Sequence, residues 1–409
     1  MMQSFTLMCW NFFGIPLAFV TNIVVTRYMG ADRYGDYLYI QKVFDFAFII
    51  FNFGLLRSLN RCILLCRDSE EESREFFGSG LILLIAIYLL ITAALYIFAF
   101  INPGIKEKGI LQIFLCIIPF SLIHYFIQYF EQTLPSSNKI NLLIIERYIP
   151  RIGFFLFSLL IYFIVMKRDF RWSPVVIVWT SFLSTQLLVY LFVIRKLRPS
   201  FKNIKSNIAA ILKQNKIYGS QVYIGDLFST AFTALMPLLL SMFGETNSGV
   251  GYYSLSLMLS HPLSFIPVVV ATSHYQAFAT YTKLPKRLVT VTFAISLFAL
   301  VCLWILVTPF INLFYTAEYS PVIALTFISS IGTLLYGISD FISRFLMAHG
   351  NGKALRNSSF IVGFGTLAMS LALIPIIHEI GAAITHLGAG IIYLLIVVVY
   401  YRKQVRANG

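Results

Sequence analysis

Charged residues are scarce in this sequence: they make up 12% of its 409 positions, whereas 58% of the positions are hydrophobic. A soluble domain usually has about 25% charged and about 45–50% apolar residues. A soluble protein of this length could not cover such an apolar excess with so few charges, so a soluble globular fold is excluded. We expect the excess apolar side chains to face lipid, which makes the chain an integral membrane protein.

Acidic residues are the scarcer kind of charge, with 17 Asp and Glu against 31 Lys and Arg and a net charge of +14. In a soluble protein this balance would suggest nucleic acid as a partner. No soluble domain is expected here to present a basic face, so we predict that nucleic acid is not a partner. The basic residues gather in short loops instead, as is typical of the cytoplasmic loops of membrane proteins.

Motifs that supply enzyme chemistry or hold cofactors are missing as well. The sequence has no glycine-rich phosphate loop, no HExxH and no GxSxG motif with triad partners, so ATP hydrolysis and hydrolase chemistry are not expected. Cys62 and Cys66 lie one helical turn apart, but no further ligands stand at zinc spacing. We therefore predict a protein that is not an enzyme and needs no metal or cofactor, with H+ or Na+ coupling left open.

Long apolar runs are what the sequence does have. They are unbroken rather than alternating, which indicates membrane helices and not a barrel. At about 20 residues per span, the chain is predicted to be an all-α polytopic protein with about twelve transmembrane helices. The predicted spans are 5–27, 37–56, 77–101, 109–133, 141–166, 172–195, 217–240, 250–277, 288–310, 320–347, 353–377 and 379–401.

The loops predict the orientation and the division of the chain. Their basic residues fall mostly on one side, which places both termini in the cytoplasm. The long basic loop 196–216 lies near the midpoint, so we predict an N-terminal six-helix lobe (1–200), a basic cytoplasmic linker (201–216) and a C-terminal six-helix lobe (217–409). Similar turns recur in the two halves, which favours a pseudo-twofold arrangement of the lobes around a central cavity.

Basic residues inside the spans are the first candidate site. Arg147 and Arg151 are four apart and so share a helix face, roughly 10–15 Å from the cytoplasmic end of their span. Arg57 and Arg61 have the same spacing at the same membrane face. Together with Lys42 they would give the cavity a cationic cluster suited to phosphate, because the guanidinium group makes bidentate bonds to phosphate. Snorkelling of these side chains to lipid headgroups is the alternative.

Acidic residues inside the spans are candidates for ion coupling. Asp226 lies near mid-span with no basic residue within a turn, and a hydrogen bond to a hydroxyl on a neighbouring helix is the alternative role. Asp45 and Asp340 are the other candidates. Each has a basic residue within one turn, Lys42 and Arg344 respectively, so a structural ion pair is the alternative for both.

Short motifs at corresponding places in the two halves carry a family resemblance. The motif residues are Arg27-Tyr28-Met29-Gly30 followed by Tyr34-Gly35-Asp36-Tyr37, then Lys216-Ile217-Tyr218-Gly219 and Val250-Gly251-Tyr252-Tyr253-Ser254. With these motifs, the chain resembles the polysaccharide-biosynthesis branch of the multidrug/oligosaccharidyl-lipid/polysaccharide (MOP) exporter superfamily, specifically the O-antigen flippases. Met29 stands where the family usually has Leu.

The resemblance implies a MOP/MATE-like fold and a flippase in the bacterial inner membrane. Such a protein would move an undecaprenyl-diphosphate-linked oligosaccharide repeat unit from the cytoplasmic to the outer leaflet by alternating access, for surface polysaccharide or O-antigen synthesis. Its implied partners are the polyprenyl-diphosphate-linked oligosaccharide, the bilayer, and a polysaccharide polymerase and chain-length regulator.

Three other functions remain open from the sequence. An ion-coupled multidrug or small-molecule exporter of the same superfamily would need an acidic, aromatic cavity, which the arginines of the first half argue against. A membrane polysaccharide polymerase or ligase would need a large external loop, and none is predicted. A flippase for lipid II-type precursors is a close relative of the favoured function.

Overall fold

The computed structural model describes residues 2–66, 69–165, 173–227 and 232–408. Within these ranges the chain is helical and contains no strand, so the all-α membrane fold is confirmed. Nine of the described helices are long and apolar enough to cross a membrane, and the count of twelve spans stays a prediction. The loop cations Lys167, Arg168 and Arg171 lie outside the described residues.

The chain divides into two compact units, one made of residues 1–29 and 43–224 and the other of residues 30–42 and 225–409. The helices of the first unit are most of α1 (Met2–Phe51), α2 (Leu55–Leu65), α3 (Glu70–Ile101), α4 (Pro103–Glu107), α5 (Leu111–Ile117), η1 (Ile118–Phe120), α6 (Ser121–Ser136), α7 (Ile140–Val165), α8 (Pro174–Leu197), α9 (Ile204–Gln214), η2 (Asn215–Gly219) and the start of α10 (Ser220–Asp226).

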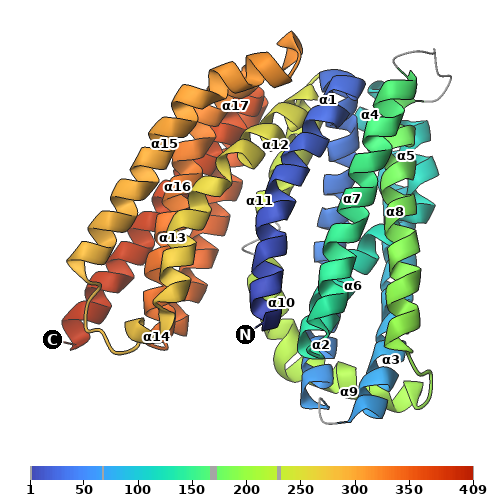
Figure 1. The fold of residues 1–409 in the computed structure, drawn as a ribbon, viewed down its shortest axis with the longest axis horizontal. Helices are drawn as coiled ribbons and strands as arrows, with labels where there is room; N and C mark the ends of the chain where they lie inside the picture. The colour runs from blue at the N-terminus through green and yellow to red at the C-terminus, as the bar shows by residue number, and fades with distance from the viewer. Residues whose placement is uncertain (1, 67–68, 166–172, 228–231, 409) are drawn as a thin grey trace. The chain divides into compact units, whose positions relative to one another are not determined.

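The second unit takes residues 30–42 of α1 together with the C-terminal helices. These are α11 (Phe232–Phe243), α12 (Ser248–Ser260), α13 (Pro262–Ser273), α14 (Tyr275–Phe278), α15 (Lys286–Phe314), η4 (Ala317–Tyr319), α16 (Pro321–Ala348) and α17 (Gly352–Asn408). Figure 1 shows α15, α16 and α17 as long, closely packed helices of this unit.

Two of the long helices contain a break in the backbone. In α1 the break is at Gly30, whose φ of 72° is the left-handed conformation that glycine adopts at low cost. In α17 it is at Ile377 and His378. The first break lies between the predicted spans 5–27 and 37–56, and the second lies at the boundary of the predicted spans 353–377 and 379–401. The segment predicted as a linker, 201–216, is itself mostly helical, since it contains α9.

Many large apolar side chains lie on the outside of the helices. Leu188 on α8 is 69% exposed, Phe298 on α15 is 70% exposed and Ile376 on α17 is 74% exposed. Water would make this surface costly at about 25 cal/mol per Å². In a bilayer the same side chains face lipid tails, so the exposed apolar belt identifies a multi-pass membrane protein.

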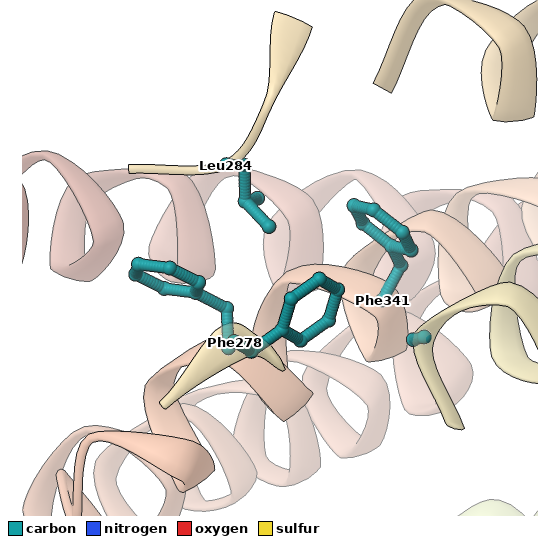
Figure 2. Close-up of a cluster of buried hydrophobic side chains, with 5 residues drawn as sticks. Phe278, Leu284 and Phe341 are labelled. Carbon is teal, nitrogen blue, oxygen red and sulfur yellow. The ribbon is translucent and has the colours of Figure 1, made fainter. Parts of the chain in front are cut away.

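The core of the second unit includes a cluster of aromatic side chains. Figure 2 shows Phe278, at the end of α14, and Leu284, in the following loop, close to Phe341 of α16. The rings of Phe278 and Phe341 meet edge to face with their centroids 5.7 Å apart. This geometry suits the quadrupoles of the two rings and fixes the short loop against α16.

Two of the sequence motifs pack against each other in the second unit. A β-carbon on Gly35 would collide with the backbone carbonyl of Asn247, and one on Gly251 would lie 3.2 Å from the ring of Tyr34. The buried amide of Asn247 donates to the carboxylate of Asp36 (2.8 Å). Gly35 is thus required for this close helix contact, and Gly251 leaves room for the Tyr34 ring.

Candidate functional site

The hairpin of α6 and α7 positions the first predicted arginine. Its turn is closed by Asn138, in the left-handed conformation at φ 55°, and by the bond from the Lys139 N–H to the Leu134 carbonyl. Antiparallel helices bring together residues at similar distances from their turn. Arg147 Nε accordingly donates to Glu131 Oε1 at 3.1 Å, with both side chains about one-third exposed or less.

Helix α2 brings a second arginine to the same end of α6. Arg57 Nη1 donates to Gln132 Oε1 at 3.3 Å, and Asn60 Nδ2 donates to the Gln132 carbonyl at 2.6 Å. Glu131 and Gln132 are consecutive. Arg57 and Arg147, which lie 90 residues apart in the sequence, are therefore held by adjacent residues of one helix.

The partners of the other two arginines are aromatic rings. Arg61 lies over the ring of Tyr218, with 5.1 Å from its guanidinium carbon to the ring centroid, and Arg151 lies over Tyr148 at 5.5 Å. Both arginines are exposed, and neither forms an ion pair within the described part of the chain. A guanidinium on an aromatic face keeps its N–H groups available for an anion.

The first helix of the chain packs beside Arg151. A β-carbon at Gly14 would lie 2.6 Å from the Tyr148 ring, so glycine is what lets α1 approach α7 here. Trp10 also packs on Tyr148, with ring centroids 5.4 Å apart. Tyr148 is thereby fixed between α1 and Arg151, which orients the guanidinium.

Lys42 and Asp45 are placed in different units. Lys42 is half-buried in the part of α1 that belongs to the second unit. Asp45 belongs to the first unit, where its Oδ1 lies 2.9 Å from Nε2 of the buried His124. His124 could not be selected from the sequence as a partner of this carboxylate, because the two residues are 79 positions apart.

The remaining acidic candidates have different surroundings. Asp340 accepts a hydrogen bond from the Tyr393 hydroxyl at 3.0 Å, and that hydroxyl also lies 3.0 Å from Ser343 Oγ. Among the described residues, no ion pair joins Asp340 to Arg344, and the Tyr393 hydroxyl lies beside the carboxylate instead. The backbone of Asp226 ends α10, and its side chain lies outside the described residues.

Two glutamates near the arginines were missed as candidate residues. Glu131 could have been found from its place before the α6–α7 turn, which mirrors that of Arg147 after it. Glu146, in contrast, could not have been found from its position. It is only 3% exposed, and its Oε2 has no hydrogen-bond partner among the described residues. Nothing in the local sequence distinguishes it from an exposed glutamate.

The arrangement at α2, α6 and α7 has the chemistry of an anion site. Four arginines on two of these helices offer planar guanidinium groups, and one carboxylate, Glu131, offsets part of their charge. Among the described residues, no group of His, Cys, Asp and Glu could hold a metal ion. Planar guanidinium groups can make paired, charge-assisted hydrogen bonds to phosphate oxygens.

Known proteins resemble the chain in sequence profile and in fold. The family described as "Polysaccharide biosynthesis protein" matches residues 2–281. Comparison with curated protein sequences gives no match. Among solved structures, the lipid II flippase MurJ in an inward closed conformation is similar with a TM-score of 0.73 and 17% identity, covering 98% of this chain and 89% of that one.

Two further structures share the fold. An inward-facing MATE multidrug resistance transporter of the MOP superfamily gives a TM-score of 0.65 at 14% identity, with 95% and 94% of the two chains covered. A MOP superfamily transporter from Pyrococcus furiosus gives 0.54 at 13%, with 98% and 93% covered. At these identities the likeness concerns the fold, and the predicted MOP/MATE-like fold is confirmed.

Proposed function

Because the chain belongs to the polysaccharide biosynthesis protein family, we propose that it is a flippase for a polyprenyl-diphosphate-linked oligosaccharide. It would move the repeat unit from the cytoplasmic to the outer leaflet of the bacterial inner membrane by alternating access of its two six-helix lobes, 1–200 and 217–409. Both termini would lie in the cytoplasm. The lipid tail would stay in the bilayer throughout.

The observation that carries this proposal is the arginine group at α2, α6 and α7. A diphosphate must leave water to cross a membrane, and this costs several kcal/mol unless charged partners replace the lost solvent. Arg61 and Arg151 offer guanidinium groups without a carboxylate partner in the described ranges. Arg57 and Arg147 are held by Gln132 and Glu131, contacts that a diphosphate could exchange for its own oxygens.

The arginines also favour a flippase over a drug exporter. A drug exporter for organic cations would be opposed by four arginines in its binding region, since like charges repel in a low dielectric. The similar MurJ structure is that of a lipid II flippase. We extend that substrate class to this chain on the strength of its arginine chemistry.

The test is a flipping measurement in sealed vesicles with a polyprenyl-diphosphate oligosaccharide. A membrane-impermeant lectin would report how much headgroup reaches the far side. We expect Arg147→Ala and Arg151→Ala each to slow flipping by roughly tenfold or more, as loss of a charge-assisted contact of about 1.5–3 kcal/mol implies. Arg356→Ala is the matched control, because Arg356 is an exposed arginine of the second unit.

Three outcomes are informative. Flipping that is lost in both arginine variants and kept in Arg356→Ala supports the flippase and its anion site. Flipping that is unchanged in all variants supports the flippase function and contradicts the proposed anion site. Vesicles with protein that flip no faster than empty vesicles, with several glycans tried, would overturn the proposed function.

A further inference from the structure

A basic pocket lies at the end of α8, in the first unit. Its volume is about 380 Å³, and it is lined by Phe192, Arg195, Lys196 and Arg198. These four residues belong to the last turns of α8 and its C-cap. None of them is among the arginines of the α2–α6–α7 site.

The three cations of this pocket have no acidic partner in the described ranges. The acidic residues of α3 are engaged elsewhere: Glu70 pairs with Arg74 at 2.8 Å, Glu71 pairs with Lys202 at 3.8 Å, and Glu72 interacts with the Cys66 thiol. Glu75 accepts from the amides of Asn203 and Asn207. Three positive charges in one pocket therefore have no counter-charge from the described part of the chain.

The chain segment that forms the wall of the pocket after α8 is held in place by contacts with α3. The C-cap of α8, Arg198, has a φ of 48°, a left-handed conformation that is costly for a residue with a β-carbon. The chain is then pinned to α3, because the Ser200 N–H donates to the Arg74 carbonyl at 2.8 Å. A β-carbon on Gly78 would collide with the Ser200 carbonyl, so glycine permits this contact.

The macrodipole explains only part of this arrangement. Positive charge in the last turn of a helix is favourable, which accounts for Arg195 and Lys196. It does not account for Arg198, the third cation of the pocket, which lies beyond the last helical turn. A left-handed residue is a common way for a helix to end, so the evidence for a ligand is the charge of Arg198 and not its backbone conformation.

The position along α8 suggests the ligand. The apolar span runs from Pro174 to Leu197, so its last turn lies where the hydrocarbon core gives way to lipid headgroups. Phe192 lies one turn nearer the apolar middle and is 44% exposed, and Lys196 Nζ is 5.8 Å from its ring centroid. The cations are suited to a lipid phosphate, and the aromatic ring on their membrane side is suited to the glycerol or prenyl carbons attached to that phosphate.

We propose that this pocket binds the phosphate group of a membrane lipid. The phosphate oxygens would accept hydrogen bonds from the guanidinium N–H groups of Arg195 and Arg198 and from the ammonium group of Lys196. Phe192 would contact the first apolar carbons of the lipid. The lipid is either an anionic phospholipid or a polyprenyl diphosphate that has not yet reached the α2–α6–α7 site.

The test counts lipids retained by the purified full chain in native mass spectrometry. The variant combines Arg195→Gln, Lys196→Gln and Arg198→Asn, with Asn chosen because it tolerates the left-handed conformation. The control combines Lys283→Gln, Lys286→Gln and Arg287→Gln, which removes three exposed cations near the start of α15 in the second unit. Each protein would be titrated with phosphatidylglycerol, phosphatidylcholine and undecaprenyl diphosphate.

We expect the α8 variant to bind one fewer lipid phosphate and to lose roughly tenfold or more in affinity, since each basic residue near the surface adds to the attraction. Loss for phosphatidylglycerol identifies the phospholipid, and loss for undecaprenyl diphosphate alone identifies the substrate lipid; both support the pocket. Equal losses in the control variant, or no loss at all, would overturn it. Flipping that fails in the wild type while lipid binding persists would reject the flippase and keep the pocket.

Discussion

Among the described residues, buried polar atoms without a hydrogen-bond partner are concentrated in the first unit, and the second unit has few, such as Ser296 Oγ and Thr385 Oγ1. Several buried groups of the second unit are paired instead: Asn247 with Asp36, Ser256 with Ser329, and Thr333 with His386. In the first unit several buried atoms have no hydrogen-bond partner in the described part of the chain. Examples are Glu146 Oε2, Ser158 Oγ and Gln186 Oε1.

This difference distinguishes buried polar groups that stabilise the fold from buried polar groups that remain available for a ligand. A satisfied polar pair inside a membrane helix bundle fixes which helices meet and at which height. An unsatisfied ionisable group there costs stability, so its retention indicates a functional role. The arginine site and the basic pocket of α8 both belong to the first unit, where most of the unsatisfied groups of the described chain lie.

The largest expected effect is at the contact between the sequence motifs of the second unit. Gly35→Leu would drive a side chain into the backbone of Asn247, which cannot move aside as a flexible side chain could. We expect the free energy of unfolding in detergent to fall by about 3 kcal/mol or more. Gly352→Ala is the control, because nothing lies within 4 Å of its added β-carbon. A stable Gly35→Leu protein would contradict this packing.

The next effect concerns the polar pair beside that contact. Asp36→Ala removes the acceptor of the buried Asn247 amide, and we expect a loss of about 1–3 kcal/mol of unfolding free energy. Asn247→Ala should cost a similar amount. The double variant should cost less than the sum of the two, because both changes remove one interaction. Strict additivity, measured by thermal unfolding, would show that the pair contributes nothing.

A smaller effect of opposite sign is expected in the first unit. Glu146→Gln replaces a buried carboxylate by a neutral group of the same shape, and a neutral amide costs less to bury. We expect unfolding free energy to rise by about 1 kcal/mol, whereas flipping slows if the acid takes part in transport. Asp36→Asn is the matched change in the second unit, and it should lower stability. The same sign in both units would break the comparison.

Much of the fold could be predicted from the sequence because the signals are local. Apolar runs of about 20 residues identify membrane helices regardless of their neighbours. Gly30, with its left-handed backbone, falls where the sequence separates the first two spans. The partition of residues 30–42 into the second unit could not be foreseen, because it depends on contacts more than 200 positions away, such as that of Asp36 with Asn247.

The candidate site was predictable in its chemistry and not in its pairing. Helical spacing placed Arg147 and Arg151 on one face of a span. It could not show that Arg57 is held by Gln132, since side-chain partners across helices depend on how the helices pack. Asp340 shows the limit most clearly. Helical spacing pairs it with Arg344, four positions along, but in the structure it accepts a hydrogen bond from Tyr393, which is 53 positions away.

The smallest effect extends the comparison to a residue outside the membrane spans. Cys66 follows α2 in the first unit, and burial, with a hydrogen bond and charge repulsion from Glu72, raises the pKa of its thiol to about 11. Only the thiolate reacts with a maleimide, so labelling of Cys66 should speed up about tenfold per pH unit between pH 7 and 9. Glu72→Gln removes the two effects of the carboxylate and leaves burial in place, so labelling at pH 8 should become a few times faster. An equal change in Glu71→Gln would attribute it to general surface charge instead of the Glu72 contact.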